Sequence, residues 1–411
     1  MHSHKMRGVQ PPVALRPCHD LLTGLKWGRP QGRMLPEVVV KKVTKVIVSL
    51  MSVSALAVAT AACSPPSKES GSKSDAATAK SAGDLGGMDA LVKAAKKEGA
   101  LNVIALPPTW ANYGNVIKGF TAKYGIKINS AQPDAASQDE INAAKSLKGT
   151  KRAPDVFDLG QSVALANTAM FAPYKVATFD KVPADFKDSN GLWVNDYGGY
   201  MSIGYDSSKV PEVKTVNDLL GKEFKGKVAL NGDPTQAGAA FSGVVMASAA
   251  NGGSADDIAP GVKFFEKLKK AGNFLPVDPT PATIESGQTP VVIDWDYTNA
   301  AETAKLKTWK VVVPEGAAVG GYYYQAINKD APHPAATRLW QEYLYSDEGQ
   351  NLYLAGGARP VRADDMEKSG TINAADFAKL PAVSGTPLLL TTEQTAKAAD
   401  YLSKNWSKVI G

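Results

Sequence analysis

PVVIDWDYTN, residues 290–299, is an apolar, β-branched run that ends in a tryptophan between two aspartates. Residues 291–293 are typical of a buried strand, because β-branched side chains fit a pleated sheet and the run is short. Carboxylates are seldom left unpaired in a core. Asp294 and Asp296 stand where this strand is expected to end, so they point to a role other than core packing.

Helical and strand patterns alternate around this stretch from Met88 onward. Besides 291–293, the patterns predict strands at 101–106, 126–129, 153–160 and 226–233. They predict helices at 88–99, 115–125, 137–149, 235–253 and 261–272, with Ser137 and Glu140 as a capping box. Strands separated by helices favour an α/β fold with mostly parallel sheets and helices on both faces, here in two lobes.

Polar and aromatic residues cluster after the predicted strands. In open α/β sheets, ligands lie beyond the carboxyl ends of the strands. The clusters are Trp110, Asn112 and Tyr113; Asp158, Gln161 and Ser162; Asn231, Asp233, Thr235 and Gln236; Asp294, Trp295 and Asp296; and Tyr322, Tyr323 and Tyr324. Aromatic walls with a few carboxylates suit an organic cation, through cation–π contacts and charge-assisted hydrogen bonds.

The formal charge of +6 is located in the leader. Residues 1–62 hold nine of the 46 Lys and Arg and two of the 40 Asp and Glu, which leaves 37 basic and 38 acidic groups in residues 63–411. The body therefore has no electrostatic basis for binding a phosphate backbone, and no nucleic-acid partner is expected.

The leader is typical of an export signal. Three lysines precede 17 uncharged residues, 46–62, and Cys63 follows. Residues 60–63 (TAAC) resemble a bacterial lipobox, with Cys63 as the lipidated residue, and the signal is expected to span 34–62. Residues 1–33 are expected to be a non-native upstream extension, and the Ser-, Ala- and Lys-rich 63–87 a flexible tether.

An enzyme is not expected. The only histidine after residue 62 is His333, between prolines, which is typical of the start of a helix rather than of a base. Nucleophile elbows, Walker loops and HExxH motifs are absent from the sequence. We therefore expect no catalytic residue, no cofactor and no bound metal. A secreted α/β hydrolase stays open as the alternative of another class, and a purely structural surface lipoprotein as a third possibility.

Three segments resemble the extracellular substrate-binding proteins of bacterial ABC importers, which have the type II periplasmic-binding-protein fold. They are TVNDLLGKEFKGKVALNGDPT (215–235), PATIESGQTPVVIDW (281–295) and INKDAPHPAATRLWQEYLYSDEGQNLYLAGGARPVR (327–362). The resemblance implies two lobes that close over a small solute at a hinge of two crossovers, near 199–203 and 322–327. It also implies delivery of the solute to the permease subunits in the membrane.

Within that family, the chain resembles the spermidine/putrescine-binding branch. There Trp110, Asn112 and Tyr113 match a first-strand binding segment, Asp233 a ligand-binding aspartate and Trp295 a stacking tryptophan. Gln236 and Tyr323 stand where acids are usual. The resemblance makes Trp295 the first candidate and Asp296 the second. Asp294 is expected to be structural, because Asp294 and Asp296 point away from Trp295 if the strand continues.

The loop 232–238 (GDPTQAG) also resembles the DPTxxG loop of ferric-iron and aminoethylphosphonate binders. A receptor for one of those ligands is therefore the alternative within the binding class. The candidate ligand-binding residues are Trp110, Asn112, Tyr113, Asp158, Gln161, Asp233, Thr235, Gln236, Trp295, Asp296 and Tyr323.

The resemblance implies an overall organisation for the chain. We expect residues 88–200 with 323–375 to form lobe 1, 201–322 to form lobe 2, and 376–411 to be a helical segment packed on both. The protein is expected to be a monomer, exported and tethered by lipid to the outer face of the cytoplasmic membrane or free in the periplasm. Its expected ligand is a polyamine-like solute.

Overall fold

The computed structural model describes residues 73–381 and 386–411. The described residues all belong to one compact unit of the chain. The expected upstream extension, the export signal, Cys63 and the tether as far as residue 72 lie outside the described residues. Within the described ranges, no helix is both long enough and apolar enough to cross a membrane.

The described strands form one two-stranded and one eight-stranded sheet. Their bounds are β1 Ala100–Ile104, β2 Lys127–Ala131, β3 Val156–Leu159, β4 Phe171–Ala172, β5 Val194–Asp206, β6 Val228–Leu230, β7 Val291–Trp295, β8 Trp309–Val312, β9 Gly320–Asn328 and β10 Arg359–Pro360.

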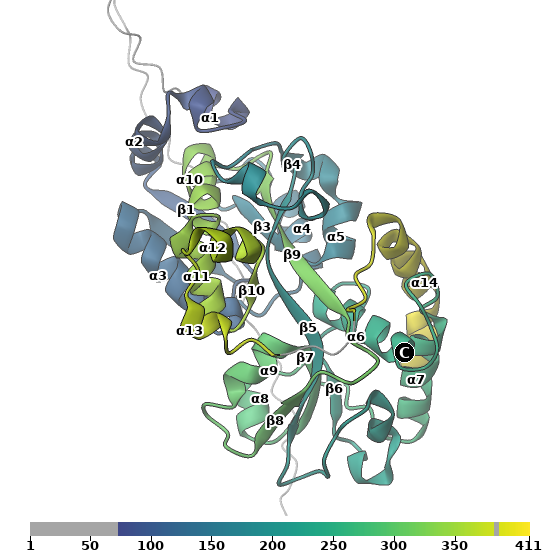
Figure 1. Cartoon of the computed structure of the whole chain (residues 1–411). Helices are drawn as coiled ribbons and strands as arrows, with labels where there is room; N and C mark the ends of the chain where they lie inside the picture. Colours follow the sequence, from purple (N-terminus) through teal and green to yellow (C-terminus); the bar gives the residue numbers. More distant parts are fainter. Residues whose placement is uncertain (1–72, 382–385) are drawn as a thin grey trace, which may run out of the picture. The chain divides into compact units, whose positions relative to one another are not determined.

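Helices cover these sheets (Figure 1). Their bounds are α1 Lys73–Thr78, α2 Met88–Glu98, α3 Tyr113–Tyr124, α4 Ser137–Ser146, α5 Gln161–Ala166, α6 Gly238–Ala249, α7 Ala259–Lys270, α8 Pro281–Glu285, α9 Asp296–Glu302, α10 Pro334–Leu344, α11 Asp347–Ala355, α12 Ala363–Ser369, α13 Ala374–Phe377 and α14 Thr392–Ile410. A 3-10 turn, η2, spans Trp110–Asn112. The predicted helices and strands are all present, with bounds shifted by a few residues, and His333 does precede a helix, α10.

Strand β5 is the central strand of the larger sheet (Figure 1). Its residues up to Tyr200 pair with β9 and β10, and its residues from Met201 onward pair with β7 and β8. This change of partners falls inside 199–203, where a crossover is expected. Strand β9 pairs with β3, β4 and the first half of β5, so the chain returns to this part of the sheet at Gly320, ahead of the expected 322–327.

The sheet directions only partly follow the expected parallel arrangement. The pairs β1–β2 and β6–β7 are parallel, whereas β5 and β9 run antiparallel to their neighbours. Alternating helices and strands predict parallel neighbours when each strand pairs with the next one along the chain. Strand β9 instead pairs with β3, which precedes it by more than 160 residues, and local patterns carry no signal for such pairing.

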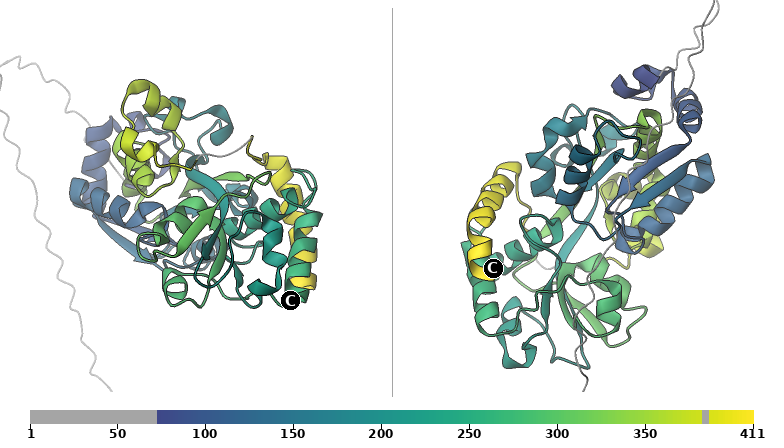
Figure 2. Two further views of the ribbon diagram at one scale, coloured as in Figure 1. Left: turned by 60° about the horizontal axis from the view of Figure 1, so that its bottom comes forward. Right: turned by 180° about the vertical axis from the view of Figure 1, so that it is seen from behind.

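Helices α6, α7 and α14 form successive layers on one side of the molecule (Figure 2). Helix α6 has a buried residue at almost every position and packs against both β7 and α7. The C-terminal α14 lies on α7 and also contacts α5. Its buried side chains Leu402 and Trp406 extend the core outward, with Trp406 packed edge-on against Phe265 at 5.3 Å.

The last part of the predicted tether is folded. Residues 73–78 form α1, and Ala76 and Ala79 are buried. The Arg338 guanidinium is itself buried and donates hydrogen bonds to the carbonyl oxygens of Ala77 and Ala79. The alanine-rich segment has little hydrophobic pattern of its own, so the sequence did not predict a helix there. Its contacts with Arg338, which is distant in the sequence, hold it on the core.

The predicted capping box of Ser137 and Glu140 is wrong. Helix α4 begins at Ser137, but it is the Asp139 carboxylate that accepts the hydrogen bond from the Ala136 N–H. The Ser137 hydroxyl accepts from the Gly160 N–H, and the Glu140 carboxylate accepts from the Asp158 N–H. Both side chains therefore bind the end of β3, which borders a cavity.

Candidate ligand-binding site

A cavity of about 360 Å³ opens where the ends of several strands meet. The loops after β1, β2 and β6 border it, together with the segment before α8, the first turn of α6 and one face of α9. The polar and aromatic residues that line it are Thr109, Trp110, Asp134, Ser137, Glu140, Asp158, Asn231, Asp278, Thr280, Asp294, Thr298, Glu302 and Tyr323. Its position at strand ends matches the expectation for an open α/β sheet.

The described lining of this cavity is acidic. Six carboxylic acids contribute to it, and no Lys, Arg or His side chain does. Only Glu302 has a described basic side chain within 4.0 Å, that of Lys305. Because low-dielectric walls strengthen the field of like charges, a cation inside this cavity is stabilised and an anion is repelled.

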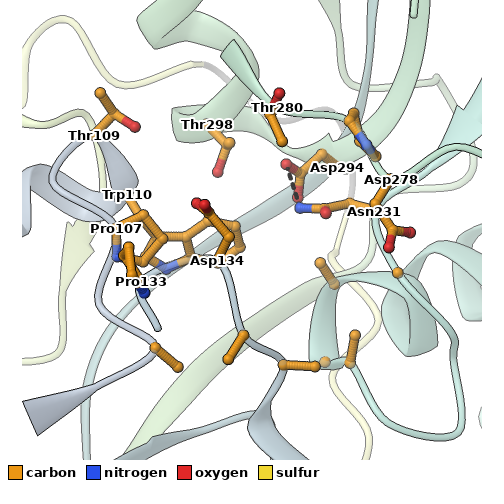
Figure 3. A pocket seen from close by; sticks show the side chains of 18 of the residues that line it. Pro107, Thr109, Trp110, Pro133, Asp134, Asn231, Asp278, Thr280, Asp294 and Thr298 are labelled. Atoms are coloured by element: carbon orange, nitrogen blue, oxygen red, sulfur yellow. Dashed lines mark hydrogen bonds between the residues drawn. The ribbon is translucent and has the colours of Figure 1, made fainter. Parts of the chain in front are cut away.

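Asp294 forms the inner wall on the β7 side. It is 2% exposed, and its Oδ2 accepts a hydrogen bond of 2.9 Å from the Asn231 amide, drawn as a dashed line in Figure 3. Its Oδ1 accepts from the backbone N–H of Trp295. Burial raises the pKa of Asp294 from 3.8 to about 7, although these two hydrogen bonds act in the opposite direction.

Glu140 on α4 and Asp158 on β3 form a buried acidic pair, and β9 and β5 separate β3 from the β7 strand that carries Asp294. One oxygen of each, Glu140 Oε1 and Asp158 Oδ1, is buried and has no hydrogen-bond partner among the described residues. Burial is the main reason that both pKa values are raised, and the charge of Asp158 raises the pKa of Glu140 further. Buried polar atoms are normally paired, so these two oxygens are free to bind a group that enters the cavity.

Trp110 and Asp134 lie together on one side of the cavity, across from the Asp294–Asn231 pair and Asp278 (Figure 3). The half-buried Trp110 ring meets the Tyr323 ring edge-on at a centroid distance of 5.6 Å. Asp134 and Asp278 are exposed and lie at the rim. The site thus combines an aromatic wall with buried carboxylates inside the cavity and exposed carboxylates at its rim.

The backbone around Trp110 is strained. Four described non-glycine residues have positive φ, and all lie in the loops after β1 and β2: Ala105, Ala111, Asn112 and Gln132. Such conformations cost on the order of 1–3 kcal/mol each and tend to occur at functional sites. Their position on both sides of Trp110 and Asp134 indicates that this part of the cavity wall is held in place by its surroundings.

Three of the predicted ligand-binding residues come together in the cavity lining, namely Trp110, Asp158 and Tyr323. The structure places the others outside it. The amide of Asn112 donates to the Leu352 carbonyl, and Tyr113 is fully buried with its hydroxyl bonded to Gln325. The Gln161 amide donates to the Leu390 carbonyl.

The predicted loop residues Asp233, Thr235 and Gln236 are exposed and do not line the cavity. The Asp233 carboxylate accepts hydrogen bonds from the N–H and hydroxyl of Thr235, which closes a tight turn. From residues 231–238, the cavity is lined by Asn231, Gly232, Ala237 and Gly238.

At the end of β7, the cavity is lined by Asp294 and not by Trp295, the first candidate from the resemblance. The strand continues through Trp295, so Asp294 and Trp295 point to opposite faces. Asp294 lines the cavity, while Trp295 is 3% exposed and lines a separate void of about 20 Å³ with Gln161. Asp296 accepts hydrogen bonds from the backbone N–H groups of Tyr200 and Tyr297, and burial raises its pKa to about 6.

Sequence reasoning missed Glu140, Asp134, Asp278, Thr298 and Glu302 as members of this lining. Glu140 had a ready local explanation as a cap. Asp134 and Asp278 lie in Pro-containing loops ahead of helices, which is a common place for any aspartate. The usable signal was the side-chain alternation in β7, which placed Asp294 opposite Trp295.

This chain is similar to known proteins both in sequence and in fold. The model of the family described as bacterial extracellular solute-binding protein matches residues 155–380, more than half of the chain. Among similar solved structures, the periplasmic binding protein AfuA from Actinobacillus pleuropneumoniae, solved with fructose-6-phosphate, has a TM-score of 0.58 at 17% identity and covers 76% of this chain and 98% of its own.

Two further solved structures have similar scores. A protein described as a spermidine/putrescine ABC transporter from Listeria monocytogenes has a TM-score of 0.56 at 14% identity, covering 76% of this chain and 99% of its own. The apo ferric ion-binding protein A of Pasteurella haemolytica has a TM-score of 0.54 at 19% identity, covering 76% and 98%. These likenesses confirm the two-lobed type II periplasmic-binding-protein fold. The family match shows that the chain belongs to the bacterial extracellular solute-binding proteins, the solute receptors of ABC importers.

Proposed function

We propose that this receptor captures a small amine-bearing cation of the polyamine class, such as spermidine or putrescine, and delivers it to a membrane permease. One observation carries the proposal, the lining with six carboxylic acids and no described basic side chain. The buried pairs Glu140–Asp158 and Asp294–Asn231 both line the cavity, Asp158 from β3 and Asp294 from β7, two strands that β9 and β5 separate in the sheet. Trp110 also lines it. Ammonium groups bound to these acids, and a carbon chain against the indole, fit that arrangement.

The proposal includes a closing motion. Lobe 1, residues 88–200 with 323–375, and lobe 2, residues 201–322, would close over the solute through the segment of β5 where its pairing changes. The ligand would shift an open–closed equilibrium because it binds the closed state better. Membership of an extracellular family implies export. We further propose that Cys63 carries the lipid that tethers the receptor outside the cytoplasmic membrane.

A receptor for 2-aminoethylphosphonate is the second candidate. Helix α6 begins at the cavity with no side-chain cap on its first turn, and unsatisfied N–H groups there favour an anion. The surrounding acids weigh against an anion, so this candidate ranks behind the amine. For ferric iron the support is weaker, since the described residues contain no group of three or more His, Cys, Asp or Glu suited to a metal ion. A hydrolase draws no support from the family or from this lining.

A ligand screen by thermal unfolding tests the proposal. The purified protein is melted with putrescine, spermidine, 2-aminoethylphosphonate, thiamine or ferric citrate. A ligand present at about 100 times its dissociation constant adds roughly 2.7 kcal/mol to the free energy of unfolding. The proposal expects the two polyamines to raise the melting temperature most. A response to the phosphonate alone would replace it with the second candidate.

A further inference from the structure

Tyr197 lies directly behind the cavity without lining it. It belongs to β5, close to the point where this strand changes its pairing partners, and it is fully buried. Three of its contacts are with residues that do line the cavity, namely Trp110, Asp158 and Tyr323. No neighbouring side chain makes this combination of contacts in the described part of the chain.

The hydroxyl of Tyr197 joins two of these residues by hydrogen bonds. The Trp110 Nε1–H donates to the Tyr197 oxygen at 2.8 Å, and the Tyr197 O–H donates to Asp158 Oδ2 at 2.8 Å. An indole N–H can only donate, so the tyrosine must use its own proton on the carboxylate. This direction also turns Asp158 so that its other oxygen, Oδ1, is the one left without a partner.

Packing fixes the ring that carries this hydroxyl. The Tyr197 ring is stacked on Tyr323 at 5.4 Å with an interplanar angle of 8°. Tyr113 and Tyr297 each meet it edge-on at 5.9 Å. A ring held on several sides cannot move its hydroxyl, so the two hydrogen bonds determine where the indole and the carboxylate lie.

We propose that Tyr197 is a positioning residue for ligand capture: it fixes the Trp110 ring and the Asp158 carboxylate relative to each other. This inference rests on the proposed function of the cavity as the ligand site. It predicts that a ligand never touches Tyr197, yet loses affinity when the hydroxyl is removed. Trp110 begins the short 3-10 turn η2, whose next two residues, Ala111 and Asn112, have left-handed backbone, so the side-chain hydrogen bond to Tyr197 adds a contact that the turn itself does not supply.

The same hydroxyl affects the titration of Asp158. Burial raises the pKa of this carboxyl, and the hydrogen bond from Tyr197 lowers it. The other titratable groups facing Asp158 are Glu140 on α4, Tyr113 on α3, Asp196 on β5, Tyr297 on α9, Tyr323 on β9, Tyr345 after α10 and Tyr353 on α11, and none of them is a cation. Loss of the Tyr197 hydroxyl therefore moves the Asp158 titration to higher pH.

The first test compares Tyr197→Phe with Tyr345→Phe. Tyr345 is a matched control, because it is also fully buried and its hydroxyl donates to β5, but at the Val194 carbonyl, outside the cavity. Polyamine affinity is measured by calorimetry from pH 5.5 to 8.5 in the full-length protein. Tyr197→Phe is expected to weaken binding on the order of tenfold and to shift its pH profile upward. Similar falls in melting temperature with unchanged affinity and pH profile in both variants would overturn the inference.

The second test needs no ligand, so it separates this inference from the proposed function. Indole resonances are recorded in ¹⁵N-labelled protein, and Trp110 is assigned through Trp110→Phe. The Trp110 N–H resonance is expected to follow the Asp158 titration in the wild type and in Tyr345→Phe, and to lose that response in Tyr197→Phe. A Trp110 resonance that is the same in all three proteins would overturn the positioning role. If polyamines fail to bind the wild type while the indole titrates as expected, only the proposed function is wrong.

Discussion

At the scale of single residues, the site depends on carboxyl groups that are buried without a cationic partner. Burial favours the neutral form of these groups, and it raises the pKa of Asp294 to about 7. An ammonium ion in the cavity supplies the charge that the protein lacks there. The acids are thus better suited to a charged ligand than to stabilising the empty protein.

Asp294 is expected to be one of the main ligand contacts. Asp294→Asn keeps the size of the side chain but removes its charge, so polyamine affinity should fall at least about tenfold, since hydrogen bonds to charged groups contribute ~1.5–3 kcal/mol. Asp233→Asn is the matched control, because Asp233 is exposed and outside the cavity. Calorimetric titration measures both. Equal losses in the two variants would remove Asp294 from the site.

Trp110 and Trp295, which the resemblance both assigns to ligand binding, should differ in what their substitution changes. Trp110→Ala removes a half-buried cavity wall and should lower affinity roughly threefold to thirtyfold, the range of one cation–π contact, with a modest fall in melting temperature. The Trp295 side chain is 3% exposed, so Trp295→Ala leaves a buried cavity and should lower the free energy of unfolding by about 3–5 kcal/mol. Urea unfolding and ligand titration separate the two effects. A stable Trp295→Ala protein with lost affinity would restore Trp295 to the site.

At the scale of elements, the ends of β3 and α6 meet at two glycines. A Cβ at Gly160 would lie 2.6 Å from Gly238 Cα, so backbone atoms would have to move. Gly160 has φ of −62°, a value that alanine adopts freely, and the cost of a substitution is therefore steric alone. This contact brings Asp158 and the first turn of α6 to the same cavity.

Gly160→Ala should therefore push β3 and α6 apart. We expect a loss of about 1–3 kcal/mol in the free energy of unfolding, as for other overpacked sites, together with weaker polyamine binding. Gly83→Ala serves as the control, since the nearest atom to its Cβ would be Ser81 Oγ at 3.4 Å. Chemical denaturation and calorimetry measure the two quantities. Wild-type stability in Gly160→Ala would contradict the described contact.

Elements were easier to predict from the sequence than the site. Strand β7 and helix α6 follow from continuous apolar runs, and helices α3 and α7 from apolar periodicity, and both kinds of pattern act over a few residues. The cavity instead combines four loops with residues of several strands and helices, and its acids come from positions with other local explanations, such as Glu140. The Ser137 and Glu140 bonds to the end of β3 depend on tertiary contacts that no local pattern encodes.

At the scale of the whole molecule, the unliganded protein should lose stability as the pH rises. The folded-state pKa of Asp294 is raised from 3.8 to about 7, so its neutral form favours folding below pH 4, and this contribution is lost as the pH rises to 7. Melting temperatures between pH 4.5 and 7.5 test this, with Asp294→Asn as the comparison. The variant should lose less stability than the wild type over this range. Parallel curves would show that Asp294 does not titrate there.

Proton release on binding tests the central claim, that buried acids hold an amine cation, most directly. Putrescine is titrated calorimetrically at pH 7 into the wild-type protein, in two buffers of different ionisation enthalpy. A bound cation lowers the pKa of Asp158 and Asp294, so the account predicts one-site binding accompanied by release of protons to the buffer. Absence of binding, or binding with an observed heat that is the same in both buffers, would contradict it.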